Sequence, residues 1–361
     1  MISLQHWHID KPLLIGLVLL SCISLLVLYS ASLQTAAIPL GQLARLAIGF
    51  GVMLAVAQIR PEHLKRWSPY IFAIGLFLLL VVLAVGAITK GAQRWLNLGL
   101  FKFQPSEIMK LGVPMMTAWY LARQNLPPRS LQIGGAILIV LIPSYLIALQ
   151  PDLGTALLIT SSGIFVVFLA GMNWFMIIGL LALAGAAVPM VWTYLMHEYQ
   201  RQRVLMLFDP TLDPLGAGYH TIQSMIAVGS GGFFGKGWLN GSQARLDFLP
   251  ESSTDFIFAV FAEEFGLIGI VVLFSLYLFI VLRGLFIAFY AQETYARLLA
   301  GSLTLTFFLY FFVNIGMVTG ILPVVGVPLP IISYGGSSIV TLMAAFGILM
   351  SIHTHRRIAQ V

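Results

Sequence analysis

The sequence contains very little charge. Only 9% of its 361 residues are Asp, Glu, Lys or Arg, whereas 59% are hydrophobic; soluble domains carry roughly 25% charged residues. So little charge cannot cover a water-facing surface, which excludes a soluble globular protein and indicates a chain solvated mostly by lipid. The single cysteine, Cys22, excludes an intrachain disulfide.

Common cofactor motifs are absent as well. The sequence has no P-loop, no Rossmann glycine pattern and no Cys/His cluster with metal-ligand spacing. Its seven histidines are scattered, and we interpret His353 and His355, which lie among basic residues, as anchors rather than ligands. No nucleic-acid partner is expected.

Long hydrophobic runs dominate the rest of the chain. Each is long enough to cross a hydrocarbon core of about 30 Å at 1.5 Å per residue. We therefore predict one all-α polytopic membrane domain, residues 1–361, with about ten transmembrane helices. The first run is interpreted as an uncleaved span, because the next follows immediately. The expected spans are 12–30, 38–58, 69–88, 105–122, 132–149, 153–169, 175–196, 255–283, 295–319 and 336–353.

The basic residues predict the orientation. With the N-terminus inside, more than half of them fall in inner segments beside helix ends, as the positive-inside rule requires. Both termini are then cytoplasmic, and the polar interval 197–254 becomes a large periplasmic loop. The inner basic residues are Lys11, Arg60, Lys65, Arg66, Arg123, Arg129, Arg283, Arg297, Arg356 and Arg357.

Two short outer segments interrupt the helical pattern. Residues 90–99, with Arg94 and Trp95, are expected to form an interfacial loop or half-helix. Residues 320–330 contain three prolines, which exclude a regular helix. Non-helical backbone at membrane depth must be buried or line a cavity, so we predict a broken re-entrant segment; the alternative is a surface turn with a hydrophobic underside.

Several ionisable residues lie inside the expected spans or at their first residues, where a charge inside the membrane costs a few kcal/mol or more and is a functional candidate. In this orientation all belong to the outer half of the bilayer, so any chemistry faces outward. They are Arg45, Glu107, Lys110, Asp152, Asp255, Glu263 and Glu264.

Each candidate also has a structural interpretation. Glu107 and Lys110 can simply pair at i, i+3. Arg45 can snorkel outward or pair with an acid on another helix. Asp152 can favour a helix N-terminus through the helix dipole.

Asp255 has two interpretations of equal weight. With Ser252 it fits a capping box that only starts a helix. Alternatively, the apolar residues after it raise its pKa and suit it to remove a proton from a sugar hydroxyl. Glu263 and Glu264 should follow two turns below it, about 100° apart around the helix, so at least one of them is structural.

The large loop offers further candidates. Its glycine-rich stretch, 229–237, can present backbone N–H groups to phosphate oxygens or can be a turn that packs closely. Its cations can hold a lipid pyrophosphate or contact anionic headgroups; they are Arg201, Arg203, Lys236 and Arg245.

The stretch from Asn314 to Ser338 closely resembles the signature of the shape, elongation, division and sporulation (SEDS) family of membrane glycosyltransferases. Residues 200–203, 213–220 and 353–356 look nearest to the elongation member of a Gram-negative bacterium; the division member is less similar. Other family-like stretches are 90–95, 103–107, 150–155 and 254–258. The signature positions include Pro323, Gly326, Pro328, Ser333, Gly335 and Gly336.

The resemblance implies an inner-membrane peptidoglycan glycosyltransferase that polymerises lipid II during cell elongation. Asp255 matches the family's essential acid. A lipid-linked glycan strand would be the donor, undecaprenyl pyrophosphate the leaving group, and inversion would require a base but no covalent nucleophile. The resemblance also implies a divalent cation, Mg or Mn, and a class B penicillin-binding protein, a single-pass transpeptidase, as partner.

Two other function classes compete with the enzyme. A lipid II flippase also needs a lipid-accessible cavity with phosphate-binding cations, but it requires polar groups that reach both sides. A scaffold that only recruits a synthase would leave the buried charges unexplained. The outward clustering of the charges favours the enzyme.

Overall fold

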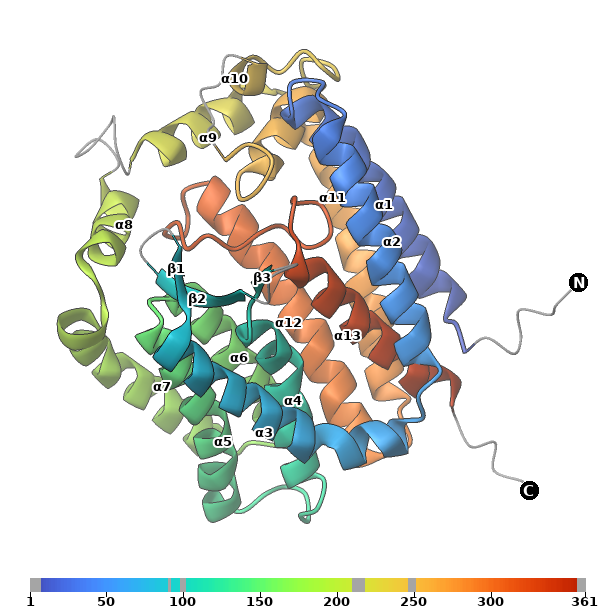
Figure 1. The fold of residues 1–361 in the computed structure, drawn as a ribbon, viewed down its shortest axis with the longest axis vertical. Helices are drawn as coiled ribbons and strands as arrows, with labels where there is room; N and C mark the ends of the chain where they lie inside the picture. The colour runs from blue at the N-terminus through green and yellow to red at the C-terminus, as the bar shows by residue number, and fades with distance from the viewer. Residues whose placement is uncertain (1–7, 90–91, 98–101, 210–217, 246–250, 356–361) are drawn as a thin grey trace, which may run out of the picture.

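In the computed structural model, the described residues are 8–89, 92–97, 102–209, 218–245 and 251–355. A helix coincides with each of the ten hydrophobic runs, which confirms the all-α polytopic fold (Figure 1). These helices are α1 (Lys11–Ala31), α2 (Ala37–Ala57), α3 (Pro61–Val85), α4 (Ser106–Leu121), α5 (Ser130–Leu149), α6 (Leu153–Leu169), α7 (Trp174–Met190), α11 (Ile257–Phe289), α12 (Thr294–Val318) and α13 (Ser337–Thr354).

Length separates these helices into two groups. Within the described ranges, eight helices are long and apolar enough to cross a membrane, α7 being counted together with the π-helix η2 (Val191–Leu195) that continues it. The other two, α4 and α6, have 16 and 17 residues. The chain is thus a multi-pass membrane protein, while the number ten stays a prediction.

Close packing around α12 and α13 forms the core. On α13, a Cβ added at Gly347 would lie 2.6 Å from the backbone oxygen of Met53 in α2, so these helices touch backbone to backbone, as small residues permit in membranes. In contrast, none of the α7 residues whose burial is described is buried, and α7 lies at the edge of the bundle (Figure 1).

The segment expected to be an interfacial loop or half-helix is instead a small antiparallel sheet. Its strands are β1 (Ala87–Thr89), β2 (Ala92–Asn97) and β3 (Lys102–Phe103), in the order β1-β2-β3. The half-helix alternative was wrong because β2 pairs on both sides, which satisfies its backbone groups without helical hydrogen bonds.

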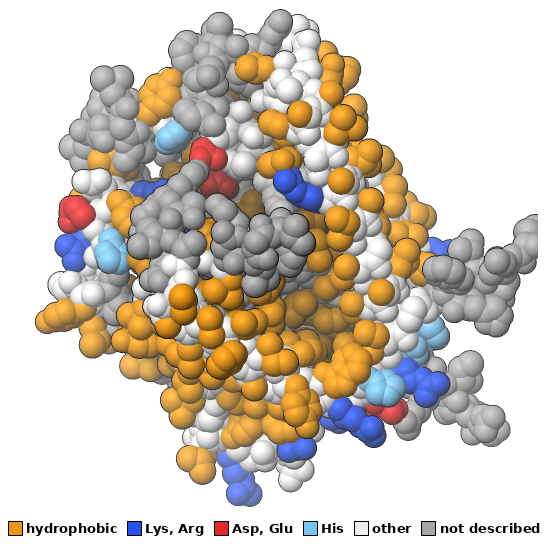
Figure 2. Space-filling view, in the orientation of Figure 1, with side chains coloured by type: hydrophobic (Ala, Val, Ile, Leu, Met, Phe, Trp, Pro, Cys, Tyr) orange, Lys and Arg blue, Asp and Glu red, His pale blue; other side chains and the backbone are white. Residues whose placement is uncertain are grey.

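The polar interval 197–254 contains α8 (Glu198–Phe208), α9 (Tyr219–Ser230) and α10 (Ser242–Arg245). These short helices arch over one end of the bundle (Figure 1). Lys, Arg and His side chains gather along the opposite, lower end of the molecule (Figure 2). Other Lys, Arg and His side chains lie on the left and upper parts of the same face in Figure 2, and the orientation of the chain in the membrane stays a prediction.

The helix α11 folds back on itself at Gly266, whose φ of 61° and ψ of −161° are not helical. The rings of Phe258 and Phe274 lie 6.1 Å apart, although sixteen residues of continuous helix would separate them by about 24 Å. The element therefore consists of a short segment, residues 257–265, and a long segment, residues 267–289, that run in opposing directions.

This fold-back reverses the expected order of the acidic residues. Glu264 accepts a hydrogen bond from Ser30, in the last turn of α1. The backbone just before Asp255 is instead hydrogen-bonded to residues 333–334. The neighbouring carbonyl of Ile332 accepts from Ser24 on α1. Ser24 precedes Ser30 by six residues, which places it about 9 Å further from the outer end of α1. The prediction that Glu263 and Glu264 lie below Asp255 was wrong: Asp255 is the deeper residue.

Candidate functional site

Asp255 lies in a turn that precedes α11, not inside the helix. The helix begins at Ile257 with Phe256 as N-cap, and the amides of Thr254 and Phe256 donate to the carbonyl of Glu251 at 3.1 and 3.2 Å. This turn delays the start of the helix. The capping-box interpretation was therefore wrong, and Ser252 donates to Ala31 O at 3.3 Å instead.

The proline-rich stretch, here called the proline segment (residues 319–336), has no regular helix. Its second half is largely buried, and its carbonyls accept hydrogen bonds from side chains on surrounding helices. Gln42 donates to Ile331 O at 3.2 Å, and Tyr277 donates to Pro330 O at 2.6 Å. The segment is thus buried in protein, as predicted for non-helical backbone at membrane depth, and the surface-turn alternative was wrong.

The signature residues meet Asp255 in this segment. A Cβ added at Gly326, where φ is +74°, would lie 3.4 Å from Asp255 Oδ2, so the carboxylate faces a glycine. Ser333 is buried and donates to Thr254 O at 2.6 Å. The remaining signature residues, Pro323, Pro328, Gly335 and Gly336, shape the same non-helical stretch.

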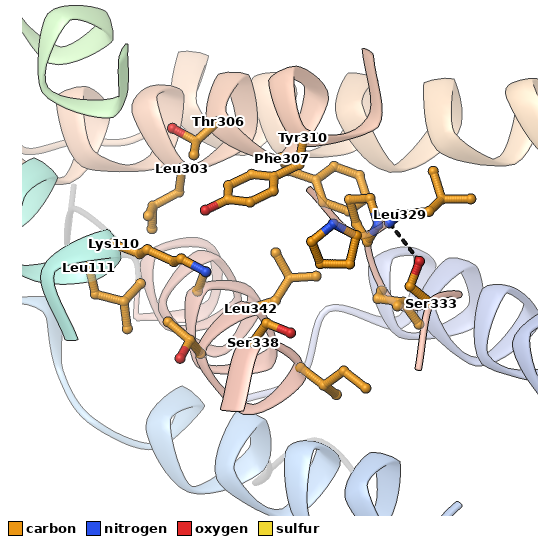
Figure 3. Close-up of a pocket in the computed structure, with 16 residues that line it drawn as sticks. Lys110, Leu111, Leu303, Thr306, Phe307, Tyr310, Leu329, Ser333, Ser338 and Leu342 are labelled. Atoms are coloured by element: carbon orange, nitrogen blue, oxygen red, sulfur yellow. Dashed lines mark hydrogen bonds between the residues drawn. The ribbon is translucent and has the colours of Figure 1, made fainter. Parts of the chain in front are cut away.

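A small apolar pocket of about 60 Å³ lies on the other side of the proline segment, between α4, α12 and α13. Leu303, Phe307 and Leu342 line it, and Lys110 and Tyr310 converge on it from α4 and α12 (Figure 3). The Lys110 ammonium lies 5.4 Å from the Tyr310 ring centroid. The pocket therefore combines an apolar wall with one cation.

The expected Glu107–Lys110 pair is confirmed, with 2.7 Å between Oε1 and Nζ. Glu107 is buried, and its Oε2 has no hydrogen-bond partner within the described ranges. Pairing and pocket lining coexist, because an ammonium has three donors.

Asp152 fulfils the structural role proposed for it. It is the N-cap of α6 and accepts from Thr155 N at 3.3 Å and from Gln104 at 3.2 Å. Arg94, on β2, lies 3.7 Å from its Oδ2. The carboxylate joins the small sheet to α6 and does not belong to the Asp255 turn.

Arg45 pairs with no acid in the described part of the chain, and its side chain is partly exposed. Its guanidinium stacks over the ring of Tyr334 at 4.0 Å, and its buried Nη1 has no hydrogen-bond partner in the described part of the chain. The amide of Tyr334 donates to Ser253 O at 2.9 Å. Arg45 is thus linked through Tyr334 to the turn that carries Asp255.

The loop cations are mostly engaged in structural contacts. Arg201 donates to Trp192 O and Thr193 O at 2.9 and 3.0 Å, and Arg203 donates to Val324 O at 3.1 Å. Lys236 pairs with Glu263 at 2.6 Å. Arg245 ends α10, and its side chain lies outside the described part of the structure.

The glycine-rich stretch packs directly against the fold-back. The amides of Lys236 and Gly237 donate to the carbonyls of Glu263 and Glu264, both at 3.0 Å. Those N–H groups are therefore occupied, and the close-packing interpretation is confirmed. Both glutamates are structural, because Glu263 also accepts from Ser242 and Glu264 from Leu239 N.

Two residues near Asp255 were not proposed as site residues from the sequence, although both lie at the ends of family-like stretches. His220, on α9, stacks on Phe256 at 5.8 Å; burial lowers its pKa, Arg203 lowers it further and Glu251 opposes this. Asn314, on α12, is fully buried and donates to Asp255 O at 2.9 Å. A polar amide within an apolar span was the signal that would have identified Asn314.

The described residues contain no group of three or more His, Cys, Asp or Glu that could hold a metal ion. Acidic side chains do appear in the hollow beneath the loop helices on the face shown in Figure 2, above a largely apolar surface. His353 contacts Asp10 at 2.8 Å and His355 stacks on His8 at 3.7 Å, which fits the anchoring role predicted for them.

Comparison with known proteins identifies the relatives of this chain. The sequence model of the FtsW/RodA/SpoVE cell cycle proteins matches residues 10–358. The peptidoglycan glycosyltransferase MrdB of Escherichia coli K12 is 54% identical over 350 residues, 97% of this chain and 95% of MrdB. The peptidoglycan glycosyltransferase RodA of Treponema pallidum is 31% identical, over 96% of this chain and 98% of RodA.

Solved structures share the fold. One, described as "Structural coordination of polymerization and crosslinking by a peptidoglycan synthase complex", superposes with a TM-score of 0.82 at 32% identity, covering 96% of this chain and 99% of that one. The rod shape determining protein RodA of Thermus thermophilus gives a TM-score of 0.72 at 28% identity, covering 95% and 96%. The resemblance read from the signature residues is confirmed.

Proposed function

Because the chain belongs to the FtsW/RodA/SpoVE family, also called SEDS, we infer that it is a peptidoglycan glycosyltransferase of the cell-shape branch, and we propose how its residues act. Identity of 54% to MrdB along nearly the whole of both chains supports the enzymatic activity. The substrate is lipid II, which the enzyme adds to a lipid-linked glycan strand.

Asp255 is the general base. It removes the proton from the 4-hydroxyl of the acceptor GlcNAc as that oxygen attacks the anomeric carbon of the donor MurNAc. The bond to undecaprenyl pyrophosphate breaks in the same step, which inverts the anomeric centre without a covalent enzyme intermediate. The observation that carries this proposal is the position of Asp255. It lies in the turn just before the short helical segment 257–265, and its carboxylate faces Gly326.

Arg45 and Lys110 are the cations for the leaving pyrophosphate. Arg45 has a buried guanidinium nitrogen without a described partner and lies beside the Asp255 turn, and Lys110 lines the small apolar pocket. Pyrophosphate release needs such positive charge. Arg201, Arg203 and Lys236 support the loop instead. Glu107 orients Lys110, and Asp152 caps α6.

A divalent cation, Mg or Mn, would neutralise the pyrophosphate when bound. The described residues do not form a complete protein cage, but Mg²⁺ commonly binds one or two carboxylates together with substrate phosphates. Substrate phosphates would supply most of that smaller set of ligands, and the protein's own part is to keep the Asp255 carboxylate available as the base.

A class B penicillin-binding protein is the proposed partner, supported by likeness to the structure of a peptidoglycan synthase complex. The enzyme lies in the bacterial inner membrane as one domain, with both termini cytoplasmic and 197–254 as a periplasmic loop. A flippase would need polar groups reaching both sides; the pocket below the proline segment is lined mainly by apolar residues, which favours the enzyme.

Replacement of the base tests the proposal. Purified Asp255→Asn, given lipid II in detergent with the partner protein, should lose about 10²- to 10⁴-fold in glycan formation while eluting and melting like the wild type. Glu198→Gln, at an exposed carboxylate on α8, is the matched control and should stay active. Detergent has no leaflets, so flipping cannot produce glycan. Full activity of Asp255→Asn would remove Asp255 from this role.

A further inference from the structure

Asn314 takes no part in the reaction above, yet its side chain is fully buried near the outer end of α12. Its Nδ2 donates to Asp255 O at 2.9 Å and to Val327 O at 2.7 Å. A buried amide costs desolvation unless it is paired. The N–H groups of Asn314 bind the backbone of Asp255 and of the proline segment, but its Oδ1 has no hydrogen-bond partner in the described part of the chain. That cost indicates a role beyond packing.

Ser333 makes the corresponding contact on the other side of Asp255. Its hydroxyl donates to Thr254 O at 2.6 Å and accepts from Leu329 N at 2.7 Å. The side chain is 2% exposed. Thr254 O and Asp255 O belong to the two peptide groups that flank the Asp255 Cα.

Holding both peptide groups fixes the direction of the carboxylate. Peptide groups are planar, so a residue has only two soft backbone dihedrals. With the planes before and after Asp255 both hydrogen-bonded to buried side chains, φ and ψ are set, and with them the Cα–Cβ bond. The helix cannot do this itself, because its first turn starts after Asp255: Ala259 N donates to Phe256 O.

We propose that Asn314 and Ser333 are positioning residues for Asp255, holding its backbone so that the carboxylate faces the acceptor hydroxyl. The proposal rests on the proposed role of Asp255 as the base. A base must lie within hydrogen-bond reach of its proton, and a misplacement of 1 Å costs on the order of 10²-fold in rate.

Gln42, on α2, provides a matched control because its side chain binds the same proline segment. It is fully buried, like Asn314, and its Nε2 donates to two carbonyls of the proline segment, Ile331 O at 3.2 Å and Ser333 O at 3.1 Å. Neither carbonyl belongs to the peptide groups that flank Asp255. Gln42→Leu therefore removes amide donors from the same segment, while the Ser333 hydroxyl and the Asn314 amide still hold Thr254 O and Asp255 O.

The experiment compares full-length Asn314→Leu, Ser333→Ala and Gln42→Leu in lipid II polymerisation, each as purified protein with its partner. We expect kcat to fall about 100-fold in Asn314→Leu and about 10-fold in Ser333→Ala, with KM within about twofold of wild type. Asn314→Gln keeps the amide donors and should recover part of kcat. Gln42→Leu should lower the melting temperature yet keep kcat within about threefold.

The pH profile separates positioning from stability. The acid limb of kcat, which reports the base, should move in Asn314→Leu and stay in place in Gln42→Leu. Wild-type kcat in folded Asn314→Leu, or an equal loss in Gln42→Leu, would overturn the proposal. If Asn314→Leu does not fold, Asn314→Gln and Ser333→Ala decide it by the same comparison.

Asp255→Asn, assayed alongside, distinguishes the two levels of inference. An active Asp255→Asn would refute the base itself. An inactive Asp255→Asn together with wild-type kcat in Asn314→Leu and Ser333→Ala would refute only the positioning role.

Discussion

Replacing Gly266 by alanine should destabilise the protein strongly, because two separate costs coincide there. The φ of 61° and ψ of −161° lie in a region that is essentially restricted to glycine, at a cost of about 1–3 kcal/mol for other residues. The new Cβ would also lie 2.3 Å from Gly235 N and 2.9 Å from Phe233 O. These are backbone atoms that cannot rotate away, and overpacking costs about 1–3 kcal/mol more.

Together the two terms give about 2–6 kcal/mol, a large fraction of a typical stability of roughly 5–15 kcal/mol. The assay is thermal unfolding of Gly266→Ala in detergent, followed by tryptophan fluorescence. Gly51→Ala is the control, since a Cβ at Gly51 in α2 meets nothing within 4 Å. We expect a drop of several degrees for the first variant and none for the second.

A crosslinking experiment tests the fold-back without relying on stability. In a Cys22→Ala background, Phe258→Cys and Phe274→Cys should react with one short bis-maleimide, because the native rings are 6.1 Å apart. A continuous helix would hold the two positions about 24 Å apart. Failure to crosslink, together with wild-type melting of Gly266→Ala, would refute the fold-back.

Two further predictions concern buried ion pairs. Lys236→Met leaves Glu263 buried without its cation and should cost roughly 2 kcal/mol, discounted from about 3–5 for a fully buried pair because the Lys236 side chain is 32% exposed. The double variant with Glu263→Gln removes the charge but keeps an acceptor for Ser242 N, so it should recover stability in thermal unfolding; no recovery would contradict a paired role. Burial alone would raise the pKa of Asp10, but hydrogen bonds from His353 and Arg283 outweigh it and hold the pKa well below its usual range. The ionised Asp10 carboxylate therefore stabilises the fold above its ordinary pKa near 3.8, and this stabilisation is lost as the pH falls below that value. The difference in melting temperature between wild type and Asp10→Asn should shrink in acid, and a constant difference would contradict this role.

Hydropathy predicted the positions of the helices well, because lipid requires most residues of a membrane span to be apolar. The expected run 153–169 coincides with α6, and 38–58 differs from α2 by one residue at each end. The three prolines of the proline segment likewise predicted non-helical backbone from covalent geometry alone. These are local properties, so they can be derived from neighbouring residues in the sequence.

The fold-back could not be read in the same way. Apart from Glu263 and Glu264, the residues around Gly266 are apolar on both sides, and one glycine in such a run is a weak signal. The turn is held by the glycine-rich stretch, about thirty residues earlier. Its backbone accepts hydrogen bonds from the amides of Leu267 and Ile268 and donates to the carbonyls of Glu263 and Glu264. The capping-box prediction failed for a similar reason, since Ser252 finds a partner on α1, Ala31.

The sequence by itself determined a polytopic membrane enzyme and singled out Asp255, since membrane solvation and a strong family signature act residue by residue. Only the tertiary structure decided how deep Asp255 lies, which cations remain near it, and that Asn314 and Ser333 hold its backbone. Those features depend on pairing between helices far apart in the chain, where hydrogen-bond geometry rather than composition selects the partner.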